Sequence, residues 1–235
     1  DAQIAVAEQL GDRILKNQSL LNKARLLTMA GYYHEADNLF RQIDTVTLND
    51  VQMLQWYSVR QKYLSDYHEY VSSAGFSVPE IEKVEYYQEQ IKKTLPEDAY
   101  YRRHIAILSL ISQEKLGEAY EANMSLIGTL DRSSRNYAVQ TYWQGFICEN
   151  LEREEETIRW WVESAICDIE GAIKDNASLC SIAIKLTDPR DTERAFKYIR
   201  LSLEDAIFYN AKLRMVQIAS TMPWIEKAYI DAKER

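Results

Sequence analysis

The sequence predicts an all-α fold of tandem antiparallel helix hairpins, a tetratricopeptide-like (TPR-like) α-solenoid that forms a right-handed superhelix. Three observations support this prediction. Apolar residues recur at spacings of three and four along most of the 235-residue chain. No stretch shows a sustained alternation of apolar and polar residues bounded by hairpin turns. Small residues near the helix starts recur at a regular interval, which is typical of stacked helical repeats.

The strongest helical pattern covers residues 157–173. The residues that would form its apolar face are Ile158, Trp161, Val162, Ala165, Ile166, Ile169, Ala172 and Ile173. A second pattern of the same period runs from Ala138 to Phe146, and a break at residues 149–153 separates the two. So short a break predicts two helices packed antiparallel.

The repeat is visible in the small residues early in each second helix. Ala119, Thr157 and Ala195 are 38 residues apart, and Ala36 lies 83 residues before Ala119. The longer interval leaves room for one additional helix pair. We place it as a long helix that residues 47–50 cap and that reaches about Ser73, ended by Gly75, and a second helix from Ser77 to about Lys93.

Small residues also occur twelve positions earlier, on the first helices of the pairs. Ala24, Gly145 and Ala183 occupy this position, although the second repeat has Ile107 there. Small side chains let the two helices of a hairpin approach closely. We therefore expect Gly145 at a close helix crossing, opposite the helix that carries Trp161.

Each of the four prolines is expected to begin a helix. Pro79 lies within the capping box of residues 77–80, Pro96 opens another segment, Pro189 follows Asp188, and Pro223 opens a final helix over residues 222–235. Because that helix has no stop signal, we expect it to continue in the parent protein. The chain is thus predicted to be one domain, residues 1–235, of about five helix pairs plus this helix.

Composition excludes several kinds of partner. A formal net charge of −8 removes the basis for direct nucleic-acid binding, which needs clustered cations. The longest apolar run is too short to span a bilayer, so membrane contact is expected only through a segment outside residues 1–235. Cys148, Cys167 and Cys180 lack the spacing of a metal site and are expected to be buried free thiols.

No enzyme motif is present in the sequence. There is no glycine-rich phosphate loop, no His-Glu-x-x-His and no Gly-x-Ser-x-Gly. His34 with Asp37 is the nearest approach to a metal-ligand pair, and we favour a turn histidine there. We therefore predict a protein that is not an enzyme and has no metal and no cofactor.

Aromatic residues are the candidates for ligand binding. Sixteen Tyr, five Trp and five Phe include adjacent pairs at residues 32–33, 56–57, 86–87, 100–101, 142–143 and 160–161. Such rings either line a groove or partner surface or fill gaps between helices, and we favour gap filling for most of them. The candidate ligand-binding residues are Tyr142, Trp143, Trp160, Tyr209, Asn210 and Arg214.

Asn210 and Arg214 are included because a spacing of four places them on one helix face. There they could clamp a carboxylate or a backbone group. The alternative is an intramolecular salt bridge from Arg214.

Three segments resemble a known family: residues 168–179, residues 195–199 and residues 202–214. They are similar to the distal repeats of an uncharacterised bacterial family. In that family a signal peptide and a TPR-like sensor region precede one membrane-spanning helix, a coiled coil and a cytoplasmic regulatory output. The turn at residues 187–191 departs from the glycine-containing turn of the family. The resemblance implies a periplasmic or extracytoplasmic location, but no binding residues.

The first functional hypothesis is therefore a sensor or interaction region of a membrane-anchored, transcription-linked regulator. Its ligand would be a protein or peptide, or alternatively a glycan. The second hypothesis is a free-standing cytoplasmic TPR-like adaptor that scaffolds a complex. The third is an enzyme with an unrecognised site.

Overall fold

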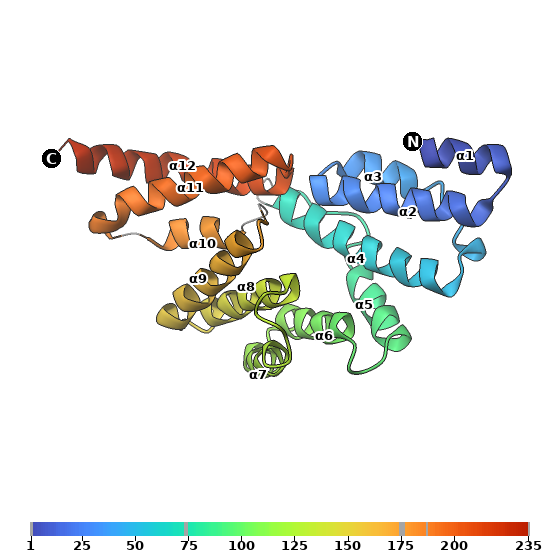
Figure 1. The fold of residues 1–235 in the computed structure, drawn as a ribbon, viewed down its shortest axis with the longest axis horizontal. Helices are drawn as coiled ribbons and strands as arrows, with labels where there is room; N and C mark the ends of the chain where they lie inside the picture. Colours follow the sequence, from blue (N-terminus) through green and yellow to red (C-terminus); the bar gives the residue numbers. More distant parts are fainter. Residues whose placement is uncertain (1, 73–74, 174–176, 187, 235) are drawn as a thin grey trace. The chain divides into compact units, whose positions relative to one another are not determined.

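The computed structural model describes residues 2–72, 75–173, 177–186 and 188–234. These residues form twelve α-helices and no strand (Figure 1), which confirms the predicted all-α fold. The chain divides into two compact units, Asp1–Ile105 and Ala106–Arg235, and each is described by itself. The single domain expected from the sequence stays a prediction.

The first unit contains five complete helices and the beginning of a sixth. They are α1 (Ala2–Leu10), α2 (Arg13–Ala30), α3 (Tyr33–Phe40), α4 (Asp50–Ser72), α5 (Lys83–Thr94) and the start of α6 (Tyr100–Ser112), with a 3-10 turn at Thr45–Thr47. Helix α2 packs against α1, α3 and α4, and α4 packs against α5. The core between them is rich in aromatic rings, among them Tyr33, Phe40 and Tyr63.

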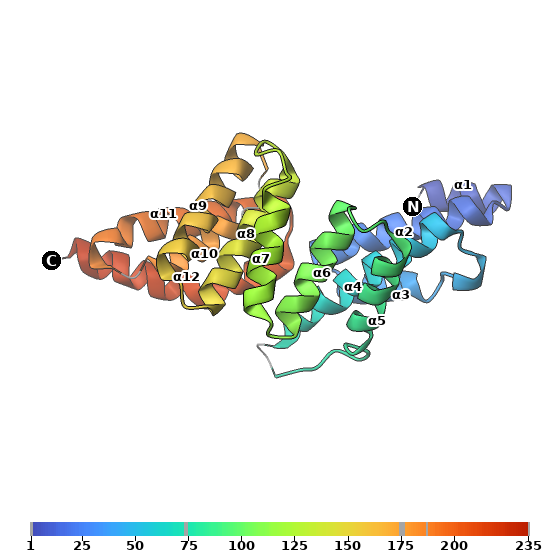
Figure 2. The same cartoon turned by 90° about the horizontal axis from the view of Figure 1, so that it is seen from below.

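The second unit contains the remainder of α6 and six further helices. They are α7 (Leu116–Ile127), α8 (Arg135–Asn150), α9 (Glu154–Glu170), α10 (Ala177–Lys185), α11 (Thr192–Phe208) and α12 (Lys212–Lys233). From α7 to α12 each helix packs on the next, and the pair α8 and α9 lies side by side in Figures 1 and 2. All three cysteines are buried free thiols, as predicted.

The same turn closes most of the hairpins. At the end of the first helix one residue adopts a left-handed conformation, and the next N–H donates to a carbonyl five residues earlier. After α2 the left-handed residue is Gly31 (φ 78°), and Tyr32 N–H donates to Leu27 at 2.8 Å. After α8 it is Glu152 (φ 58°), and Arg153 N–H donates to Cys148 at 2.9 Å. The turns therefore repeat although the glycine does not.

Burial of the small residues confirms the repeat register. Ala36, Ala119, Thr157 and Ala195, the small residues of the second helices, are all 2% exposed or less. Their counterparts Ala24 and Ala183 on the first helices are equally buried. The interval read from the sequence therefore marks where paired helices touch.

Gly145 lies at the close crossing that the sequence predicted. A β-carbon built on Gly145 would lie 2.4 Å from Cδ1 and 2.5 Å from Nε1 of Trp161. The indole of Trp161 thus packs flush against the backbone of α8, and its Nε1 donates to the carbonyl of Tyr142 at 3.3 Å. Only a residue without a side chain leaves this space.

The predicted helix over residues 77–93 begins later, at Lys83. The expected capping box does not form, because Glu80 adopts a left-handed conformation (φ 66°) and pairs with Arg60 and Lys83 instead. The long helix before it does run from Asp50 to Ser72, and Gly75 (φ 77°) follows, as expected. Asn49 and Gln52 cap α4 reciprocally through their side chains.

The prediction of a separate helix over residues 222–235 is wrong. Helix α12 begins at Lys212 and passes through Pro223. Proline removes the N–H that would bond to the carbonyl of Ala219, and because both residues are exposed, water can satisfy that carbonyl. A proline on the outer face of a helix is therefore a weaker stop than the sequence reading assumed.

The predicted apolar face of residues 157–173 is partly wrong. Val162, Ile166 and Ile169 are exposed, and α9 ends at Glu170. The buried face instead combines Trp160, Trp161 and Ala165 with small or polar residues such as Thr157 and Ser164. The Ser164 hydroxyl donates to the carbonyl of Ala138 at 2.8 Å, which satisfies it within the core.

Candidate functional site

Three of the six predicted site residues contribute to packing in the second unit. Trp160 is buried against Ile127 and Cys148. Tyr142 packs on the cluster around Trp161. Trp143 is half-buried, and its ring meets that of Tyr142 edge to face at 5.8 Å. The doublet at residues 160–161 has both rings buried, whereas Tyr86 is exposed beside buried Tyr87.

The other three predicted residues do not share one helix face. Asn210 lies between α11 and α12 with φ 52°, as the left-handed residue of the hairpin turn. Asparagine tolerates this conformation, and its backbone role accounts for its position. Tyr209 is exposed, and Arg214 donates to Gln217 one turn further along α12. The expected helical spacing is therefore wrong, while a ligand-binding role for the six residues stays a prediction.

A cleft in the first unit brings together more charged and aromatic side chains than the surroundings of the six predicted residues. It has a volume of about 650 Å³, and we call it the Arg60 cleft. It is formed by α3, α4, α5 and the segment before α5. Its lining residues are His34, Asp37, Phe40, Arg41, Trp56, Arg60, Tyr63, Leu64, Tyr67, Val78, Pro79, Glu80, Lys83 and Tyr87.

Arg60 is the central charge of this cleft. Its side chain is 9% exposed, and its Nη2 lies 2.7 Å from Glu80 Oε2. Its Nη1 lies 3.8 Å from Asp37 Oδ1. The guanidinium also lies over the rings of Phe40 at 4.9 Å and Tyr63 at 5.4 Å from the ring centres. Aromatic faces stabilise a cation that has lost most of its water.

Each carboxylate that pairs with Arg60 also pairs with a second, more exposed cation. Asp37 also pairs with Arg41 at 2.7 Å, and Glu80 also pairs with Lys83. Three cations thus face two carboxylates, so the cleft carries a small positive excess. The hydrogen bond from Lys83 lowers the pKa of Glu80, while burial opposes this effect. Each carboxylate has more lone pairs than its ion pairs use, so both can accept hydrogen bonds from a ligand.

Glu80 marks the cleft as a place where backbone strain is stored. A glutamate with φ 66° is less stable than one in the helical or extended region, by about 1 kcal/mol. Its two ion pairs hold it in place. Strain of this kind often accumulates at binding sites, which supports the cleft as the candidate site.

The Arg60 cleft was not predicted from the sequence. The doublets at residues 56–57 and 86–87 supply Trp56 and Tyr87, but no sequence pattern pointed to Arg60. An arginine inside a helical pattern is usually solvated, so nothing in the sequence marked it as buried. Asp37 and His34 do line one cleft, yet Asp37 is held by Arg41. Within the described ranges no group of three or more potential metal ligands occurs.

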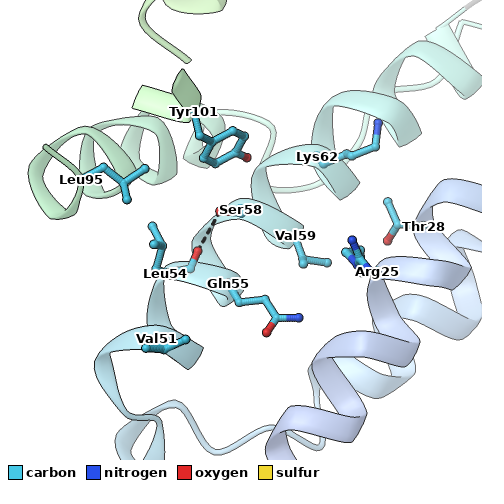
Figure 3. Close-up of a pocket in the computed structure, with 10 residues that line it drawn as sticks. All are labelled: Arg25, Thr28, Val51, Leu54, Gln55, Ser58, Val59, Lys62, Leu95 and Tyr101. Atoms are coloured by element: carbon cyan, nitrogen blue, oxygen red, sulfur yellow. Dashed lines mark hydrogen bonds between the residues drawn. The ribbon is translucent and has the colours of Figure 1, made fainter. Parts of the chain in front are cut away.

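A second cavity of about 520 Å³ lies on another side of α4, and we call it the Arg25 pocket (Figure 3). It shares no lining residue with the Arg60 cleft. Its lining residues are Arg25, Thr28, Val51, Leu54, Gln55, Ser58, Val59, Lys62, Leu95 and Tyr101. The six residues predicted from the sequence line neither cavity.

Buried tyrosines beside the Arg60 cleft should make the first unit sensitive to alkali. Burial raises the pKa of Tyr63 to about 12. An unfolded tyrosine ionises near pH 10, so the stability that Tyr63 contributes is complete below pH 10 and is lost between pH 10 and 12. We expect the free energy of unfolding to fall by about 2 to 3 kcal/mol more in the wild type than in Tyr63→Phe over this range.

Urea unfolding followed by circular dichroism at several pH values measures this difference. Tyrosinate absorbance then reports whether ionisation accompanies unfolding. Equal losses in the wild type and in Tyr63→Phe would show that the Tyr63 hydroxyl titrates freely in the folded protein.

The fold and the two cavities define a helical-repeat binding module of the TPR class. Helix hairpins follow one another along the chain, and both cavities open between neighbouring helices. Among the described helices none has the length and apolar character needed to cross a membrane.

Residues 1–220 match the family described as the SusR N-terminal TPR domain, and the chain belongs to this family. TPR domains generally bind proteins or other ligands and are typically scaffolds rather than catalysts. No characterised protein and no solved structure matches the chain at a significant level.

Proposed function

We propose that this chain is the ligand-binding sensor region of a membrane-anchored regulator and that its ligand occupies the Arg60 cleft. Family membership supports a binding role, and the family description places such a domain at the N-terminal end of a longer protein. The regulatory output and the extracytoplasmic location rest on the resemblance noted above. The observation that carries the choice of site is the buried Arg60 guanidinium, which is flanked by aromatic rings and paired with Asp37 and Glu80.

The chemistry of the cleft selects a polar ligand with an apolar face. Asp37 and Glu80 can accept hydrogen bonds, and Arg41 and Lys83 can donate them. Trp56, Tyr67 and Tyr87 add ring surface. A protein or peptide segment meets these requirements, because its backbone supplies donors and acceptors while a side chain covers the rings. A glycan offers hydroxyl groups and one apolar ring face, and it is the alternative.

The test is a binding screen on the whole chain by thermal shift, with a random peptide library and a set of neutral and acidic oligosaccharides as separate arms. Hits are then measured by calorimetry on His34→Ala and Lys83→Gln. Both side chains line the cleft and are exposed, so their replacement should not unfold the protein. We expect each change to weaken binding about threefold to tenfold.

His68→Ala is the matched control, because His68 is an exposed histidine of α4 that does not line the cleft. Its affinity should equal that of the wild type. A ligand whose affinity is the same in His34→Ala, Lys83→Gln and His68→Ala would refute the cleft as the site. Binding in the peptide arm supports a protein partner, and binding in the oligosaccharide arm alone supports the glycan.

A further inference from the structure

The Arg25 pocket differs in chemistry from the Arg60 cleft. It lies between α2, one face of α4, Leu95 and the start of α6. In Figure 3, Val51, Leu54 and Leu95 lie on one side, while Arg25, Thr28 and Lys62 lie on the other. The pocket therefore has an apolar wall and a polar wall.

The polar wall is cationic. Arg25 and Lys62 are the only ionic groups among the ten lining residues, and no carboxylate is present. Lys62 is paired with Asp66 at 2.8 Å, so part of its charge is already neutralised. None of the ion pairs formed by the described residues includes Arg25. The wall thus carries roughly one uncompensated positive charge, which suits a monoanion.

Thr28 supplies an independent indication of a ligand. It is 1% exposed, yet its hydroxyl oxygen is buried without a hydrogen-bond partner. A buried hydroxyl left unpaired costs about 1 to 3 kcal/mol. Arg25 and Thr28 lie three residues apart on one face of α2. An anion held by Arg25 would therefore offer the acceptor that Thr28 lacks.

The apolar wall sets the other half of the ligand. Val51 is 73% exposed, which is a large hydrophobic area to leave in water. Leu54, Leu95 and the ring of Tyr101 extend this surface along the cavity. A volume of about 520 Å³ lies within the usual range for small-molecule sites. A flexible aliphatic chain could cover these side chains and remove them from water.

We propose that the Arg25 pocket binds a linear aliphatic monocarboxylate, with the carboxylate at Arg25 and Thr28 and the hydrocarbon chain over Val51, Leu54 and Leu95. This site is separate from the ligand site of the proposed function. The first unit would then bind a second ligand of different chemistry, a small amphipathic acid.

The experiment is calorimetry of the whole chain with hexanoate, octanoate and decanoate, and with octanamide as the uncharged analogue. Each added methylene should tighten binding by up to about fourfold until the cavity is filled. Octanamide should bind about tenfold more weakly than octanoate, because it lacks the charge that Arg25 recognises. Octanoate that binds no better than octanamide would overturn the proposal.

Variants locate the site. Arg25→Gln should weaken octanoate binding about tenfold. Arg13→Gln, which removes an exposed cation at the start of the same helix and outside the pocket, should leave the affinity unchanged.

Thr28→Val should also weaken octanoate binding. The melting temperature of this variant should equal or exceed that of the wild type, because an unpaired buried hydroxyl is lost. If the Thr28 hydroxyl served only the fold, Thr28→Val would lower the melting temperature and leave the affinity for octanoate unchanged.

Equal affinity of Arg25→Gln and the wild type for octanoate, or an equal loss in Arg13→Gln, would overturn the assignment. His34→Ala should bind octanoate normally, since His34 lines the other cavity. Failure of the carboxylate experiment and failure of the peptide and oligosaccharide screen are therefore distinguishable outcomes.

Discussion

Replacing Arg60 with alanine is expected to lower the free energy of unfolding by about 3 kcal/mol, the largest effect predicted for a single change in the first unit. The change removes the common partner of Asp37 and Glu80 and leaves Glu80 in its left-handed conformation with one ion pair. It also leaves a void beside Phe40 and Tyr63. Urea unfolding measured at constant pH gives the difference.

Two matched variants separate the causes. Arg60→Met keeps most of the side-chain volume, so it should restore part of the loss that is due to packing but none that is due to charge. Arg41, the other partner of Asp37, has a side chain that is 77% exposed, so Arg41→Ala should cost less than about 1 kcal/mol. Equal losses in Arg60→Ala and Arg41→Ala would contradict the central role of Arg60.

Gly145→Leu should destabilise the second unit by about 1 to 3 kcal/mol. Even the β-carbon would lie 2.4 Å from the indole of Trp161, and neither the ring nor the helix backbone can yield without disturbing the crossing. At the size of this chain, each kcal/mol corresponds to a fall of roughly 2 to 4 °C in melting temperature. Differential scanning calorimetry resolves a change of this size.

Gly117 provides the control on the same chain. It also lies within a helix, α7, but a β-carbon there would have nothing within 4 Å. Gly117→Ala should therefore stabilise the protein by about 0.4 to 1 kcal/mol through the unfolded state, whereas Gly145→Ala should destabilise it. An unchanged melting temperature for Gly145→Leu would contradict a close contact between Gly145 and the indole of Trp161.

The helical repeat could be predicted because it rests on residue size at fixed spacing. Ala36, Ala119 and Ala195 are small and apolar where helices touch, and any larger side chain would separate the pair. Gly145 was predictable for the same reason. At such positions the type of a single residue is enough to indicate a close helix contact.

Features that depend on two distant segments could not be predicted in this way. Glu152 takes the conformation that a glycine takes after α2, because the hairpin geometry overrides the local preference. The burial of Arg60 depends on Glu80, twenty residues later, and on rings from α3. The site predicted in the second half of the chain rested on residue type and on spacing within one helix, whereas the Arg60 cleft is defined by how α3, α4 and α5 meet.

Hydrogen exchange on the whole chain, with and without the ligand that the binding screen identifies, tests the central claim most directly. If the ligand occupies the Arg60 cleft, protection should increase in α3, in the middle of α4 and at the start of α5, and should not change in α8, α9 or α12. Protection confined to the segments that carry Tyr142, Trp160 and Arg214, with α3 to α5 unaffected, would contradict the assignment and place the binding site in the second unit.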